Sequence, residues 1–359
     1  MSVDKTLLVM AGGTGGHVFP ALATADWLRQ QGWQIEWLGS ERGMENRLVP
    51  DAGIRLHAIS VTGLRGKGRL SLLLAPFNLL RALWQALLVV RRVNPDAVLG
   101  MGGFASGPGG LAAWILGKPL LVHEQNAIPG LTNKILARFS TRVMEAFPGA
   151  FAAKFAALHT GNPVRNTISL LADPVQRFAG RKGPMRLLVV GGSLGAQAIN
   201  ACLPKALALI PEAQRPEVWH QAGVKNIEAA RQAYQQAGIE VRLDAFIDDM
   251  QGAYGWADLV LCRAGALTVS ELAMAGVGSI LVPFPFAVDD HQTANGGFLA
   301  DNKAALLLPQ SQLSPERLQQ LLQQLDDRDQ LLAMAQSARA LATPDATARV
   351  AQQCQECAR

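Results

Sequence analysis

The sequence has few cysteines and no long uninterrupted apolar run, and we expect no secretory signal peptide. Its four cysteines, Cys202, Cys262, Cys354 and Cys357, are too scattered for a disulfide framework, which is expected of a protein in a reducing compartment. Cys354 and Cys357 have no second C-x-x-C pair, so we interpret them as two thiols on one helix rather than as a metal site. Residues 2–6 lead directly into an apolar strand, which excludes a secretory signal peptide.

Several nucleotide and catalytic motifs are also missing. Neither main glycine cluster fits G-x-G-x-x-G or is followed by Gly-Lys-Ser/Thr, and no metal-ligand spacing occurs. Glu36 stands near the position that usually binds the ribose of NAD, so a dehydrogenase stays open as a minor alternative. Nucleic-acid binding is disfavoured, because the basic residues border an aliphatic run and are not interleaved with aromatics.

Acidic residues are absent between positions 52 and 95, although the chain as a whole carries 28 of them. Within this window, a glycine-rich basic loop (63–69) precedes a mostly apolar, helical segment (71–92). Polar residues and Pro76 interrupt the segment, so it is a poor candidate for a membrane span. Two interpretations stay open: a core helix of an α/β domain, or a helix and loop that contact an anionic membrane surface. The second predicts membrane contacts at Arg65, Lys67, Arg69, Leu73, Phe77 and Trp84.

Two similar glycine-rich units organise the 359 residues. In the first, an apolar strand (7–11) is followed by four glycines between positions 12 and 16 and by a helical segment (21–29) that has Pro20 at its start. In the second, a strand (185–190), a glycine loop (191–196) and a helix (197–210) follow in the same order. A glycine loop that opens a helix directs backbone N–H groups and the positive end of the helix dipole at an anion, usually phosphate.

These units predict two doubly wound α/β domains, because one hydrophobic core rarely serves a chain of this length. We place the first domain at residues 1–163, joined by a closing helix at 343–359, and the second at 164–342. Further strands are predicted at 34–38, 54–59, 97–101, 119–123 and 142–147 in the first domain, and at 217–221, 240–244, 259–262 and 279–283 in the second.

Polar residues follow the predicted strands where doubly wound sheets bind ligands. His17 lies at the exit of the first glycine loop, within reach of whatever the loop holds. His123, Glu124 and Asn126 end the strand at 119–123. Each of these side chains could instead satisfy the backbone of its own loop.

Seven segments together resemble the MurG family, and they occur in family order across nearly the whole chain. The segments are 12–21, 101–108, 123–126, 161–165, 191–196, 263–271 and 291–295. MurG enzymes transfer N-acetylglucosamine from UDP-N-acetylglucosamine (UDP-GlcNAc) to lipid I, the undecaprenyl-diphosphate-linked muramyl pentapeptide, and thereby form lipid II for peptidoglycan. One departure is Phe104, where family members often have tyrosine.

The resemblance implies the GT-B fold, two Rossmann-like domains facing across a cleft. It places the donor mostly on the second domain and the lipid-linked diphosphate of the acceptor on the first. It further implies an inverting transfer to the C4 hydroxyl of the muramyl moiety, no cofactor, and a place at the cytoplasmic face of the inner membrane beside other cell-wall synthesis proteins. The implied donor-binding residues are Thr14, Gly15, Gly16, Asn126, Arg165, Gly192, Ser193, Ile247, Ala266, Leu267, Thr268, Val269, Ser270, Glu271, Gln292 and Asn295.

The chemistry of such a transfer fits the residue types. Helix N-termini can stabilise the departing UDP without a divalent ion, so we expect the transfer to be independent of metal. The acceptor hydroxyl needs a general base, for which His17 is the first candidate and Glu124 the second. Two rival functions are a UDP-GlcNAc 2-epimerase or other nucleotide-sugar enzyme, and a scaffold that binds UDP-sugar without turnover.

Overall fold

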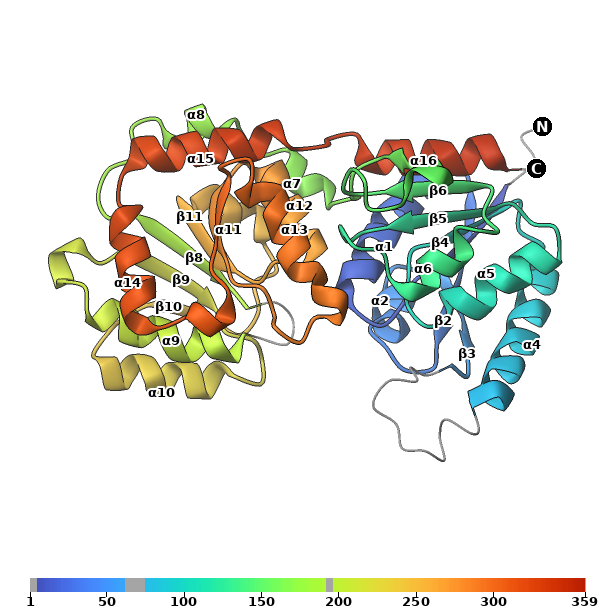
Figure 1. Cartoon of the computed structure of the whole chain (residues 1–359), viewed down its shortest axis with the longest axis horizontal. Helices are drawn as coiled ribbons and strands as arrows, with labels where there is room; N and C mark the ends of the chain where they lie inside the picture. Colours follow the sequence, from blue (N-terminus) through green and yellow to red (C-terminus); the bar gives the residue numbers. More distant parts are fainter. Residues whose placement is uncertain (1–4, 62–74, 192–195, 359) are drawn as a thin grey trace. The chain divides into compact units, whose positions relative to one another are not determined.

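A computed structural model describes residues 5–61, 75–191 and 196–358. The chain forms two compact units, one made of residues 1–165 and 345–359 and the other of residues 166–344 (Figure 1). Arg65, Lys67, Arg69, Leu73, Gly192 and Ser193 lie outside the described residues.

The first unit contains a parallel sheet of seven strands in the order β3-β2-β1-β4-β5-β6-β7. Its strands are β1 (Thr6–Met10), β2 (Gln34–Ser40), β3 (Arg55–Ile59), β4 (Ala97–Gly100), β5 (Leu120–Glu124), β6 (Arg142–Glu145) and β7 (Leu158–His159). Its helices are α1 (Gly15–Gln30), α2 (Glu45–Asp51), α4 (Ala75–Val93), α5 (Ser106–Ile115), α6 (Leu131–Leu136) and α16 (Ala346–Cys357).

The side chains of the central strand β1 point alternately into the two halves of this core. Leu7 and Val9 point to the layer that contains α1, α2 and α16, whereas Leu8 and Met10 point to the layer of α4, α5 and α6. All four side chains are fully buried, which is why the strand is a continuous apolar run rather than an alternating one. The closing helix α16 completes the first layer with Val350, Ala351 and Cys354.

Helix α4 covers the sheet with its small residues and leaves its large ones exposed. Ala82, Ala86 and Val90, spaced four residues apart, are buried against the second layer. Phe77 and Trp84 are 73% and 60% exposed. The interpretation as a core helix is therefore confirmed for the side of α4 that faces the sheet, where Leu83 and Leu87 also pack in part, and the membrane contact stays a prediction.

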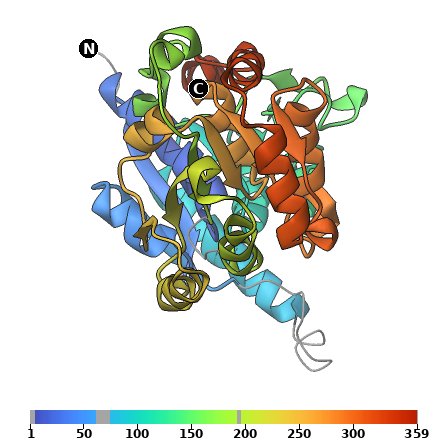
Figure 2. The same ribbon diagram turned by 90° about the vertical axis from the view of Figure 1, so that its left-hand side faces the viewer.

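The second unit has a six-stranded parallel sheet in the order β10-β9-β8-β11-β12-β13, with helices on both faces (Figures 1 and 2). Its strands are β8 (Arg186–Val190), β9 (Glu217–Gln221), β10 (Arg242–Asp244), β11 (Leu259–Cys262), β12 (Gly278–Leu281) and β13 (Ala305–Leu307). Its helices are α7 (Asn166–Ser169), α8 (Pro174–Phe178), α9 (Gln197–Ala208), α10 (Ile227–Ala237), α11 (Met250–Trp256), α12 (Ala266–Ala275), α13 (His291–Ala300), α14 (Pro315–Gln324) and α15 (Arg328–Ala340).

The predicted doubly wound α/β architecture is confirmed in each unit, with differences at the ends of elements. Helix α1 begins at Gly15, so Pro20 lies inside the helix and not at its start. Helix α5 likewise begins at Ser106, within the stretch expected to be a glycine-rich loop. The short strands β7 and β13 were not predicted, because two or three residues carry too little pattern to recognise.

Candidate active site

Three loops of the first unit meet at the carboxyl edge of its sheet. Met10 at the end of β1 pairs with Gly100 at the end of β4, and Gly100 pairs with Val122 in β5. The glycine loop after β1, the loop after β4 and the residues after β5 are therefore neighbours. This is the edge at which open parallel sheets bind ligands.

The first two loops pack backbone against backbone. A Cβ added to Gly103 would lie 2.6 Å from the carbonyl oxygen of Gly12, at a residue whose φ is +90°. The neighbouring Gly102, with φ of +96°, supports the His17 ring, and a Cβ there would lie 2.9 Å from the ring atoms Cε1 and Nδ1. Glycine is required at both positions for its conformation and for the close approach.

The first glycine loop already holds a carboxylate of the protein. The N–H of Gly13 donates to Glu45 Oε2 at 2.9 Å, and Glu45 is fully buried. Ser40 donates to the other oxygen through its N–H and its hydroxyl. The prediction that the whole loop presents free N–H groups was thus wrong for Gly13. Within the described residues, the N–H groups of Thr14, Gly15 and Gly16 at the start of α1 have no acceptor.

His17 is held by a residue to which sequence reasoning gave no role. Its Nδ1 lies 2.8 Å from Oε1 of Gln125, which directly follows β5. Gln125 is 1% exposed, and its Nε2 contacts Nδ1 of His123 at 3.0 Å. The only sequence signal for Gln125 was its place inside the polar segment 123–126.

The two candidate bases have different surroundings. Glu124 is buried, and one carboxylate oxygen accepts from the N–H and Nδ2 of Asn126. The other oxygen accepts from the N–H of Gly130 and Nδ2 of Asn133. Four donors therefore occupy the Glu124 carboxylate, whereas Nε2 of the partly exposed His17 has no partner within the described residues. This geometry favours His17 over Glu124 as a base.

Arg165 is the remaining predicted site residue of this unit. Its guanidinium lies over the ring of Phe19, 5.8 Å from the centroid, and the side chain is partly exposed. Phe19 belongs to the first turns of α1, so Arg165 brings a positive charge to the helix that starts with the glycine loop.

The second unit repeats the arrangement at its own carboxyl edge. Cys262 at the end of β11 pairs with Val190 in β8 and with Leu281 in β12. Consequently Gly191, which follows β8, the start of α12 and the segment after β12 are neighbours. The predicted residues Ala266–Ser270 form the first turns of α12, whose N-terminus no side chain caps.

Glu271 lies in α12 and is 4% exposed. Its Oε2 accepts a hydrogen bond from the Tyr254 hydroxyl at 3.1 Å. A buried carboxylate is costly unless hydrogen bonds compensate it. The Glu271 carboxylate is therefore a buried hydrogen-bond acceptor on α12.

The other predicted donor residues of the second unit also border this edge. Oε1 of Gln292 accepts from the N–H of Phe284, which follows β12. Asn295 is fully buried, and its Nδ2 donates to the carbonyl of Ala264 before α12. The side chain of Ile247 is buried after β10.

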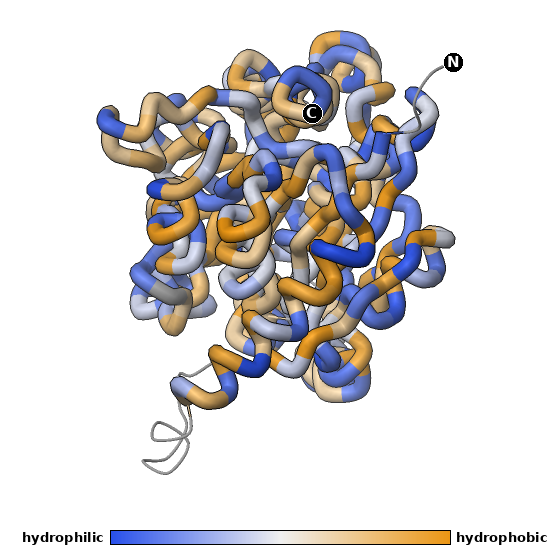
Figure 3. Tube along the Cα trace, turned by 90° about the vertical axis from the view of Figure 1, so that its right-hand side faces the viewer, coloured by the Kyte–Doolittle hydropathy of each residue, from blue (hydrophilic) through white to orange (hydrophobic). Residues whose placement is uncertain are grey.

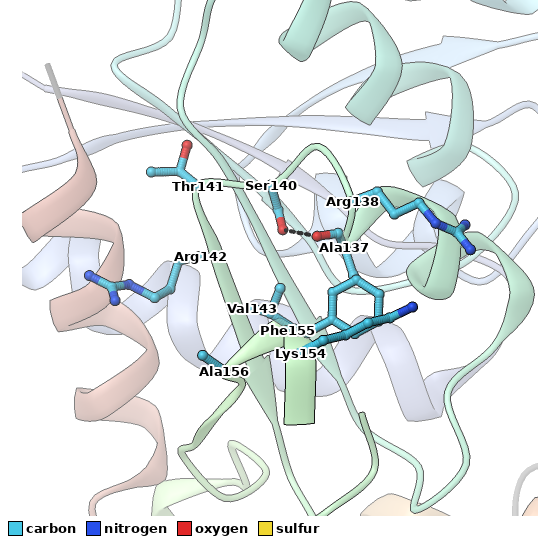
Figure 4. A pocket seen from close by; sticks show the side chains of 9 residues that line it. All are labelled: Ala137, Arg138, Ser140, Thr141, Arg142, Val143, Lys154, Phe155 and Ala156. Atoms are coloured by element: carbon cyan, nitrogen blue, oxygen red, sulfur yellow. Dashed lines mark hydrogen bonds between the residues drawn. The ribbon is translucent and has the colours of Figure 1, made fainter. Parts of the chain in front are cut away.

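A cavity of about 520 Å³ in the first unit lies apart from these residues. It surrounds the turn between α6 and β6, at the start of β6, and none of the predicted site residues lines it (Figure 4). Its three cations do not converge, since Arg142 points away from Arg138 and Lys154 in Figure 4. Across residues 5–61, 75–191 and 196–358, no group of three or more His, Cys, Asp or Glu side chains is placed to hold a metal ion.

Comparison with known proteins identifies the family to which the chain is similar. Residues 7–145 match the glycosyltransferase family 28 N-terminal domain, and residues 186–350 match the glycosyltransferase family 28 C-terminal domain. The UDP-N-acetylglucosamine–N-acetylmuramyl-(pentapeptide) pyrophosphoryl-undecaprenol N-acetylglucosamine transferase of Marinobacter nauticus is 59% identical over 99% of both chains. The enzyme of the same name from Nitrosospira multiformis is 57% identical over 99% of both.

Solved structures agree with the sequence relatives. The crystal structure of Acinetobacter baumannii MurG superposes with a TM-score of 0.86 at 44% identity, covering 98% of this chain and 99% of that one. The glycosyltransferase of kitacinnamycin superposes with a TM-score of 0.72 at 15% identity, which shows a shared fold alone. The fold is therefore of the GT-B type, and the chain belongs to the MurG family within glycosyltransferase family 28.

Proposed function

We infer that this chain is an inverting N-acetylglucosaminyltransferase. It moves N-acetylglucosamine from UDP-GlcNAc to the C4 hydroxyl of the muramyl moiety of lipid I and so forms lipid II for peptidoglycan. The observation that carries this conclusion is the 59% identity to a transferase of that name over 99% of both chains. The glycine loops and uncapped helix starts described above provide suitable chemistry for two diphosphate-containing substrates.

The transfer is tested by incubating the protein with labelled UDP-GlcNAc and a lipid I analogue. We expect a labelled disaccharide only when the acceptor is present. Conversion of UDP-GlcNAc in the absence of acceptor would instead indicate an epimerase, and binding without turnover a scaffold.

For the donor, we propose that the second unit binds the UDP moiety. The backbone at Ile247 contacts the uracil, Glu271 accepts from the ribose hydroxyls, and Gln292 and Asn295 contact the sugar. Support comes from their common place at the carboxyl edge of the second sheet. The diphosphate is assigned to Ser193, Gly192 and the residues 266–270 that open α12, where the helix dipole favours negative charge.

For the acceptor, we propose that the start of α1 binds the lipid-linked diphosphate and that His17 deprotonates the attacking hydroxyl. The N–H groups of Thr14, Gly15 and Gly16 are available there, and Nε2 of His17 has no partner among the described residues. Thr14–Gly16, Asn126 and Arg165 also match donor-contact positions of the family, and we retain that assignment as part of the proposal. Glu124 then holds the 124–133 loop in shape.

Catalysis is expected to need no divalent ion, because helix N-termini can carry the charge of the departing UDP. Turnover should persist at an unchanged rate in excess EDTA. A loss of activity that Mg²⁺ or Mn²⁺ restores would refute this expectation.

We also propose that α4 brings the enzyme to the membrane that contains lipid I. Phe77, Leu80 and Trp84 are 73%, 64% and 60% exposed, although all three side chains are apolar. An apolar groove of about 530 Å³ continues this surface onto α5 and α6; Leu79, Leu80, Leu83, Pro108, Leu111, Ile135 and Phe139 are among its lining residues. Figure 3 shows hydrophobic and hydrophilic residues alternating along the helices of this side.

The charge of the surrounding residues favours an anionic lipid surface. Arg81, Lys134 and Arg138 are exposed on or beside α4 and α6. Each basic residue near such a surface contributes about 1 kcal/mol, screened by salt. Among the helices that the structure describes, none has the length and hydrophobicity of a membrane span. The proposed location is the cytoplasmic face of the inner membrane, beside other cell-wall synthesis proteins.

Vesicle co-sedimentation tests this surface. Changing Phe77, Leu80 and Trp84 together to serine should weaken binding to anionic vesicles at least about tenfold, because each inserted apolar side chain contributes on the order of 1 kcal/mol or more. A matched control changes Leu170 and Val224, which are 74% and 68% exposed on the second unit, and should bind as the parent does. Binding that is indifferent to the triple change, or equal on neutral vesicles, would show that α4 only covers its sheet.

A further inference from the structure

A continuous chain of hydrogen bonds runs from His17 into the interior of the first unit. Nδ1 of His17 lies 2.8 Å from Oε1 of Gln125, and Nε2 of Gln125 lies 3.0 Å from Nδ1 of His123. Nε2 of His123 then lies 2.9 Å from the carbonyl oxygen of Gly161. His123 is fully buried and Gln125 is 1% exposed, so the two inner members are shielded from water.

The direction of the chain is set at its inner end. A backbone carbonyl can only accept, so the nitrogen of His123 that faces Gly161 must carry a proton. Burial lowers the pKa of His123 to about 4, and the ring is therefore neutral at physiological pH. A neutral imidazole has one N–H, which leaves Nδ1 of His123 as an acceptor.

The amide of Gln125 can then adopt only one orientation. Its Nε2 faces two acceptors, Nδ1 of His123 at 3.0 Å and the carbonyl oxygen of His123 at 3.1 Å. In a rotated amide, Oε1 of Gln125 would face Nδ1 and the carbonyl oxygen of His123. All three atoms would then be acceptors, with no hydrogen atom between them. Because an amide orientation is assigned from its network, these two independent acceptors fix the assignment. Oε1 of Gln125 therefore faces His17 and accepts.

From this we propose that Gln125 and His123 are positioning residues that fix His17 in the tautomer with its proton on Nδ1 and its lone pair on Nε2. Nδ1 of His17 donates to Gln125, and Nε2 is the nitrogen without a partner among the described residues. The other tautomer would carry a proton on Nε2 and could not accept one from a hydroxyl. The nitrogen that a histidine offers to substrate is set by the bond that its other nitrogen makes.

The expected effect on kcat rests on the proposed role of His17 as the base. The assignment of the His17 tautomer does not depend on that role. We expect Gln125→Leu, which removes the acceptor, to lower kcat by about tenfold to a hundredfold. This is less than the full contribution of a general base, which is about 10²–10⁴-fold. The KM for UDP-GlcNAc should stay within about twofold. His123→Phe keeps a planar aromatic ring and the backbone carbonyl, one of the two acceptors, so its effect should be smaller and in the same direction.

The direct test is ¹⁵N NMR of the full chain labelled at its six histidines. At about pH 8, above the ordinary imidazole pKa of about 6.5, the His17 signals, assigned with a His17→Gln variant, should show a protonated Nδ1 and an unprotonated Nε2. In Gln125→Leu they should shift toward a mixture of tautomers, while the signals of His57 and His159 stay in place as internal references.

A protonated Nε2 on His17 in the parent protein would overturn the inference. An unchanged His17 spectrum in Gln125→Leu and in His123→Phe would also overturn it. If Gln125→Leu does not fold, an unchanged spectrum in His123→Phe alone decides against the inference. The failure of the proposed base is separate: full activity of a His17→Ala variant would remove the catalytic role while leaving the NMR result to stand.

Discussion

Replacing His17 by alanine is expected to lower kcat by at least about a hundredfold, because general-base assistance is worth about 10²–10⁴-fold. His17 ends the first glycine loop, its ring rests on Gly102, and its Nδ1 is held by Gln125. The affinity for UDP should hardly change, because the UDP moiety of the donor is assigned mostly to residues of the second unit. Steady-state kinetics with a lipid I analogue, combined with UDP binding by calorimetry, measures both quantities.

A matched control is His159→Ala, which removes an exposed histidine of the same unit whose Nε2 lies 3.1 Å from the carbonyl oxygen of Ala146. Its kcat should stay within about twofold of the parent. A loss of less than about fivefold in His17→Ala would move the base elsewhere. Glu124→Gln would then be the next variant, although four donors already occupy that carboxylate.

Replacing Glu271 by alanine should weaken UDP binding by about tenfold to a hundredfold, because a hydrogen bond to a charged group is worth about 1.5–3 kcal/mol. The carboxylate is 4% exposed and accepts from the Tyr254 hydroxyl. Glu271→Gln keeps the side chain's size and removes the charge, and it should show the same loss in weaker form.

Tyr254→Phe separates donor binding from a purely structural role of Glu271. This variant removes the hydroxyl partner and keeps the buried ring, so UDP affinity should fall by less than about threefold if the ribose contact belongs to Glu271. Loss of thermal stability in both Glu271 variants with an unchanged dissociation constant for UDP would contradict the assignment.

The sequence predicted the strands best where apolar runs were long and bounded by polar residues. The predicted strands at 217–221 and 259–262 coincide with β9 and β11. Helix α4 shows why periodicity alone could not settle orientation. Its apolar stripe left a core helix and a membrane-surface helix open; in the structure the small Ala82 and Ala86 are buried, whereas Trp84 is exposed.

The candidate site was predictable in position and less so in its connections. Glycines cluster at 12–16 and at 102–110 in the sequence, and the parallel pairing of β1 with β4 places the starts of these two stretches together. The contact of Gly13 with Glu45 spans 32 positions, and that of His17 with Gln125 spans 108. Such contacts depend on how strands pair, which one sequence does not reveal at the level of single side chains.

The central claim is a direct displacement at the anomeric carbon of UDP-GlcNAc by the C4 hydroxyl of the muramyl moiety. The most direct measurement is proton and carbon NMR of the purified disaccharide formed from a lipid I analogue. We predict a β linkage between the transferred N-acetylglucosamine and C4 of the muramyl ring, because one displacement inverts the α-linked donor. An α linkage, or attachment at another hydroxyl, would contradict the account.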